Sequence, residues 1–73
     1  MVTRYRVTVE GAVAEAVVAL LRDRFGAVAV RAEEDRTVLD GPIADQAALR
    51  ALLTVLWDTG SHVRSLRVTP VGR

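Results

Sequence analysis

The sequence of 73 residues contains no cysteine, lysine or asparagine, and only 4% of its residues are aromatic. The absence of cysteine excludes disulfides, a thiolate nucleophile and cysteine-ligated metal sites. No apolar run approaches the length of about 18 residues that a membrane-spanning helix requires, and no signal-peptide core is recognisable near Met1. We therefore expect a cytoplasmic protein with no membrane partner.

A strong excess of charge of one sign is also lacking. Ten basic residues, all of them arginine, face nine acidic residues, which gives a formal net charge of +1. This balance provides no general attraction to polyanions. GC-rich codon usage is enough to explain the arginine bias, so a role in anion recognition has to be argued at each position.

What the chain does have is apolar residues, which make up 51% of it. A domain of about 60 residues buries only about 60% of the surface that its unfolded chain exposes. Small domains therefore commonly rely on disulfides, a metal or a partner. With no cysteine and one histidine, we expect a homo-oligomer, with a dimer as the first choice, or a complex with another protein.

The spacing of the apolar residues alternates between the strand and helix periods. Strict alternation predicts strands at 3–10, 27–32, 37–40 and 63–69, and helical spacing predicts helices at 12–25 and from Asp45 to about Asp58. Asp45 suits an N-cap, Gly41-Pro42 is expected to close the third strand, and 70–73 to form a frayed tail. The order predicts one α+β domain over 1–73, a ferredoxin-like βαββαβ two-layer sandwich. Its four-stranded antiparallel sheet carries both helices on one face.

The other face of this sheet is expected to be open. If Tyr5, Val7 and Val9 point to the helices, arginines of three strands point away from them. Two residues at the margins of the apolar stripes of the expected helices are further candidates. They are Val18, which lies beside the stripe that includes Leu20, and Trp57. The expected interface residues are Arg4, Arg6, Arg31, Arg67, Trp57 and Val18.

Nucleic acid is not the expected partner of this face. Sheets that bind RNA stack bases on aromatic side chains of their central strands. Here the single tyrosine, Tyr5, is expected to point to the core. Acidic residues also interrupt any basic patch.

No group of residues predicts catalysis or a cofactor. His62 is the only histidine, and no residues at metal-ligand spacing accompany it. Asp40 or Tyr5 is a conceivable acid–base partner, but neither is clearly indicated. Glu33-Glu34-Asp35 is typical of a solvated hairpin tip rather than of a cation site. We expect no catalytic residue, no metal and no cofactor.

The segment from Thr37 to Leu49, followed by Leu52-Leu53, Asp58 and Gly60, resembles a family of small, mostly actinobacterial proteins. Their common pattern includes a "TGPV-DQAALHGLL" segment. The resemblance covers roughly 37–68, and the tryptophans usual in the family's first helix are missing here. The family is uncharacterised, so the resemblance implies no catalytic residue.

The function that we expect is a non-enzymatic module for self-association or protein binding through the open sheet face. One alternative is a small-molecule sensor resembling the ACT domain, with its ligand at a dimer interface near Gly11 or Gly41. A small dimeric α/β-barrel enzyme is the weakest candidate, because such enzymes need polar side chains that converge on the sheet.

Overall fold

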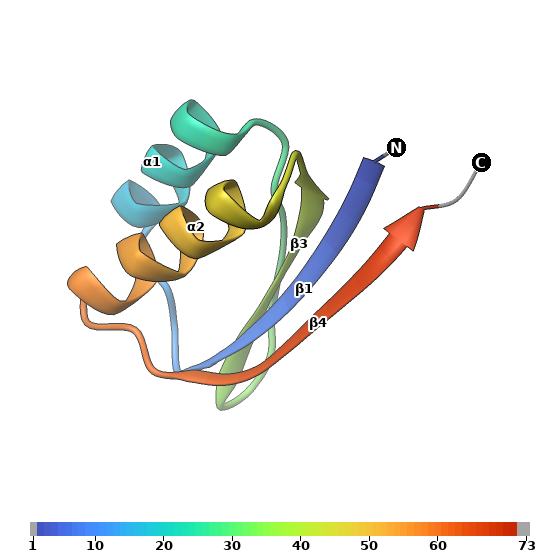
Figure 1. Cartoon of the computed structure of the whole chain (residues 1–73). Helices are drawn as coiled ribbons and strands as arrows, with labels where there is room; N and C mark the ends of the chain where they lie inside the picture. The colour runs from blue at the N-terminus through green and yellow to red at the C-terminus, as the bar shows by residue number, and fades with distance from the viewer. Residues whose placement is uncertain (1, 72–73) are drawn as a thin grey trace.

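The computed structural model describes residues 2–71 and confirms the expected α+β, ferredoxin-like arrangement. The elements are β1 (Val2–Glu10), α1 (Glu15–Phe25), β2 (Ala29–Ala32), β3 (Arg36–Ile43), α2 (Gln46–Asp58) and β4 (Val63–Val71). All paired strands are antiparallel, in the order β2-β3-β1-β4. Both helices lie on one face of the sheet, and β4 runs along its edge (Figure 1).

The core lies between β1, β3 and the helices. Alternation along β1 turns Tyr5, Val7 and Val9 toward the helices, where each is at most 1% exposed. Leu21 of α1 and Leu52 and Leu56 of α2 close this layer and are fully buried. The other core residues are Val28, Leu39, Ile43 and Val55.

The connections follow the local chemistry of the chain. Asp45 caps α2 as predicted, since its Oδ1 accepts a hydrogen bond of 2.8 Å from the amide of Ala48. Gly26 ends α1 with φ at 87°, a conformation that favours glycine. The guanidinium of Arg22 then donates to the carbonyl of Val28 at 3.0 Å and ties α1 to the start of β2.

Several predicted boundaries were wrong. Helix α1 begins at Glu15 instead of residue 12, and β2 begins at Ala29 instead of residue 27. The loops that precede these two elements are thus longer than predicted. Strand β3 continues through Gly41-Pro42 to Ile43. Since β2 pairs with β3 only as far as Asp40, Pro42 has strand β1 on one side alone, as is usual for proline in a sheet.

The prediction of a frayed tail was wrong for its first two residues. Pro70 and Val71 belong to β4 and are aligned with Thr3 and Val2 of β1. Pro70 is tolerated because β4 is an edge strand. The remaining two residues of the predicted tail, 72–73, lie outside the described part of the chain.

The packed face of α1 also differs from the predicted stripe. Leu20 remains 39% exposed, whereas Val18 is only 8% exposed. The helix is therefore turned so that Val18 faces the protein. The interpretation of Val18 as a surplus shoulder residue was wrong.

Candidate functional site

The open face of the sheet carries all four arginines that the sequence analysis selected. Arg4 and Arg6 alternate with the buried Tyr5 and Val7 along β1, so they point away from the helices. Arg67 of β4 is aligned with Arg6. Arg31 of β2 is aligned with Val38 of β3.

Asp40 lies at the centre of this face and pairs with two arginines of β1. Its Oδ1 is 2.7 Å from Nη2 of Arg4, and its Oδ2 is 3.1 Å from Nε of Arg6. The hydrogen bond from Arg4, together with that from Arg6, holds the pKa of the Asp40 carboxyl below its usual value against the opposing effect of burial. The sequence left open which residues of β3 face outward, and the register assigns Val38 and Asp40 to the open face.

A second group of ion pairs lies at the β2–β3 hairpin. Glu33 accepts from Nε of Arg36 at 2.8 Å and from Nε of Arg31 at 3.0 Å. The hydrogen bond from Arg36 is the main reason why the pKa of Glu33 is lowered. The expected hairpin tip at Glu33-Glu34-Asp35 is thus tied to arginines, and within residues 2–71 no group of three His, Cys, Asp or Glu could hold a metal ion.

Arg67 differs from the other three arginines. Arg4, Arg6 and Arg31 each pair with a carboxylate of the same chain. Arg67 makes no ion pair within the part of the chain that the structure describes, and it lies directly across from Arg6. Like charges at directly opposed positions of two strands are unfavourable. The β1–β4 half of the open face therefore has an uncompensated positive charge.

An apolar flank, which the sequence analysis missed, adjoins this charge on the other side of β4. It consists of Leu66 and Val68, which face the helix side of the sheet in register with Val7 and Tyr5. They remain 40% and 43% exposed because the helices leave the edge strand uncovered (Figure 1). The alternation of β4 did predict their direction, but period alone cannot show how far a helix layer extends.

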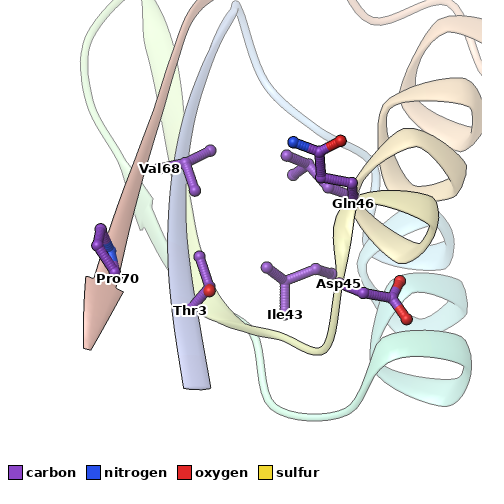
Figure 2. A pocket seen from close by; sticks show the side chains of 7 residues that line it. Thr3, Ile43, Asp45, Gln46, Val68 and Pro70 are labelled. Carbon is purple, nitrogen blue, oxygen red and sulfur yellow. The ribbon is translucent and has the colours of Figure 1, made fainter. Parts of the chain in front are cut away.

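A hollow of about 340 Å³ continues the flank toward the start of α2. Figure 2 shows Val68 and Pro70 of β4 and Thr3 of β1 across from Ile43 and Gln46. Asp45 and Leu49 complete the walls of this hollow. The result is a mostly apolar depression that opens beside strand β4.

Trp57 and Val18 occupy different environments. Trp57 is 56% exposed at the C-terminal end of α2, so the ring is a surface feature and not a cover of the core. Val18 has little surface left to offer a partner. Of these two residues, only Trp57 is accessible to a partner.

The other candidate positions do not converge on a site. The carbonyl of His62 accepts a hydrogen bond of 2.9 Å from the amide of Glu10. His62 lies just before β4, at the end of β1 that carries Glu10. Asp40 is aligned with Arg6 of β1, which is several residues away along the sheet. The conceivable pairing of His62 with Asp40 is thus not supported by the register.

The two glycines considered for a ligand are both engaged by the protein. Gly41 is buried, and a side chain there would meet the carbonyl oxygen of Ala27 at 2.6 Å and the hydroxyl of Tyr5 at 3.2 Å. The amide of Gly11 donates to the carbonyl of Asp35 at 2.8 Å, and its carbonyl accepts from the hydroxyl of Thr37 at 2.8 Å. Both glycines thus have a structural role within the chain.

Fold and surface together define a small two-layer α+β domain with a charged open sheet face. By sequence, the chain belongs to a family described as a domain of unknown function (DUF8691), whose model matches residues 4–67. A comparison with curated proteins gave no match. Neither of the described helices is long and apolar enough to cross a membrane.

Proposed function

We propose that this chain is a non-enzymatic protein-interaction module that acts in the cytoplasm and binds its partner at β4 and the adjoining open face. The observation that carries the proposal is the position of Arg67. This arginine, which has no ion-pair partner among residues 2–71, lies on the same edge strand as the exposed Leu66 and Val68. Arginine beside exposed apolar side chains is characteristic of protein interfaces.

The ion pairs of the open face favour a partner other than a second copy. Stacking of two such faces would require arginines to pair with carboxylates of the other copy. Asp40 and Glu33 are already bound to arginines of their own chain. Two stacked copies would thus bring uncompensated arginines together, whereas a partner with acidic side chains would neutralise them.

A selection experiment tests this function. A library of displayed random peptides is selected on the immobilised protein, and the enriched peptides are measured against Arg6→Glu/Arg67→Glu. Arg24→Glu/Arg50→Glu, on the helices, carries the same change in net charge as a control. We expect enriched peptides that lose binding only with the sheet variant. If no peptide is enriched, or if both variants bind equally, the proposal is wrong.

Self-association remains a second candidate because the opposite flank is also exposed. Val30 of β2 is 39% exposed, and a hollow between α1 and β2 is lined by residues that include Val13, Ala19 and Val30. Light scattering coupled to gel filtration decides this point. A mass of twice 7.9 kDa at micromolar concentrations would support a homodimer, and a mass of 7.9 kDa at all concentrations would exclude it.

The resemblance of 37–68 to small actinobacterial proteins adds no activity to this proposal. An ACT-like sensor would hold its ligand at a dimer interface near Gly11 or Gly41, and an α/β-barrel enzyme would need polar side chains that converge on the sheet. The proposed function instead uses the surface of the sheet at β4.

A further inference from the structure

Strand β4 is a free edge of the sheet. It pairs with β1 and has no strand on its other side among residues 2–71. It is nine residues long and extends beyond the helix layer (Figure 1). The outward N–H and C=O groups of an edge strand can pair with another extended chain. Pro70 has no N–H, so pairing is confined to 63–69. The register with β1 shifts beside Arg64, which leaves 65–69 as the regular part of this edge.

The two faces of β4 present different chemistry to a strand added at this edge. On the helix side, Leu66 and Val68 lead into the apolar hollow beside Ile43 (Figure 2). On the open side, Arg67 is aligned with Arg6. Side chains of an added strand would alternate between these two faces.

Charge selects the kind of strand that fits. Asp40 compensates Arg4 and Arg6, while Arg67 has no carboxylate partner among residues 2–71. An acidic side chain of the added strand would lie on the side of β4 away from β1, where it could form an ion pair with Arg67 and draw its guanidinium away from Arg6. The other side of the added strand would cover Leu66 and Val68, which removes apolar surface from water.

A second copy of β4 fits this edge poorly. It would bring a second uncompensated Arg67 to this edge, with Pro70 interrupting the ladder. Positive charge and proline on an edge strand are known to discourage self-pairing. The occupant must supply the acidic groups that β4 lacks.

We propose that β4 binds an extended segment of a partner protein, with acidic residues alternating with apolar residues, by strand addition at its free edge. This inference rests on the proposed protein-binding function and names the chemistry of the partner. Backbone hydrogen bonds would give affinity, and the alternating side chains would give specificity.

Fluorescence anisotropy with synthetic peptides tests the proposal. The probe is a labelled peptide of about seven residues, the usual span of a strand, in which valine and glutamate alternate. A valine–lysine peptide and a peptide with the same valines and glutamates in two blocks are the comparisons. We expect the alternating acidic peptide to bind about tenfold more tightly than either.

Variants assign the binding to β4. Arg67→Glu should weaken the acidic peptide about tenfold and strengthen the lysine peptide, because the charge that selects the partner is reversed. Arg24→Glu, on α1, is the control with the same change in net charge and should bind as the wild type does. Thermal melts verify that each variant is folded.

Backbone pairing has its own readout. Methylation of the peptide amides that face β4 should abolish binding, and amide NMR shifts should concentrate in 63–69. Equal binding of the block peptide, insensitivity to methylation, or equal competition by single-stranded DNA would overturn the proposal. If these tests fail while the displayed library still yields partners that depend on Arg6 and Arg67, the interaction function stands and only strand addition is wrong.

Discussion

Gly41 lies where β3 passes beneath the connection from α1 to β2. A methyl group at this position would be 2.6 Å from the carbonyl oxygen of Ala27, a distance that requires the backbone to move. Gly41→Ala should therefore lower the free energy of unfolding by about 3 kcal/mol, measured by urea denaturation.

A comparison with Gly11→Ala separates this clash from backbone strain. Gly11 has φ at 71° but nothing within 4 Å of an added Cβ. Its substitution should cost about 1 kcal/mol through conformation alone. Equal losses in the two variants would mean that the Ala27 contact is unimportant.

Tyr5 carries a buried hydroxyl that has no hydrogen-bond partner in the described part of the chain. Burial, with a further contribution from the charge of Asp40, raises the pKa of this hydroxyl. Since an unpaired buried polar group costs free energy, Tyr5→Phe should leave stability within about 0.5 kcal/mol of the wild type or increase it. Thermal and urea unfolding measure this change, and a loss of more than about 1 kcal/mol would mean that the hydroxyl is hydrogen-bonded in solution.

Asp45, Val18 and Leu20 show what sequence reasoning could and could not reach at this scale. Asp45 was predicted correctly as an N-cap because capping is a local property of the chain. Val18 and Leu20 exchanged roles because both fit an apolar stripe, and only the docking of α1 on the sheet decides which one is buried.

At the scale of elements, Asp40 joins the two central strands across the open face. The pKa of its carboxyl is lowered by the hydrogen bonds from Arg4 and Arg6 of β1, so the folded state favours the ionised form. This stabilisation is present above the ordinary aspartate pKa of about 4. It is lost as the pH falls through the lower pKa of the folded state.

Asp40→Asn should lower the free energy of unfolding by about 1 kcal/mol at pH 7, since the arginines are half exposed. Because protonation removes the same charge from the wild type, the two proteins should converge at about pH 2. Urea unfolding from pH 7 to 2 measures this. Asp58→Asn, at the exposed end of α2, is the control for net charge. A difference that persists at low pH would contradict the ion-pair explanation.

The order and type of the elements could be predicted from periodicity, but some of their ends could not. Strand β3 was expected to end before Gly41-Pro42 because both residues usually break strands. It continues to Ile43 because β1 remains beside it after β2 has ended. Likewise, Pro70 belongs to β4 because one neighbour, β1, is enough to hold an edge strand.

Over the whole molecule, apolar and basic surface are separated instead of mixed. The sequence predicted a partner because apolar residues make up 51% of a short chain, and it placed the interface mainly on the open sheet face. The structure puts arginines there and leaves Leu66 and Val68 exposed on the helix side of β4. Composition gives the amount of apolar surplus, whereas its location depends on how much of the sheet the helices cover.

The position of Leu66 and Val68 on the surface predicts how the folded protein binds an apolar dye. Leu66→Ser/Val68→Ser should reduce the fluorescence of bound anilinonaphthalene sulfonate by about half, because both side chains belong to the exposed flank. Their partial burial limits the loss of stability to about 1–2 kcal/mol, measured by thermal unfolding. Leu20→Ser removes a leucine of similar exposure from α1 and should leave most of the signal. If Leu20→Ser caused the larger decrease in fluorescence, the principal apolar surface would lie on α1. Strand β4 would then lack the apolar surface that the proposed partner requires.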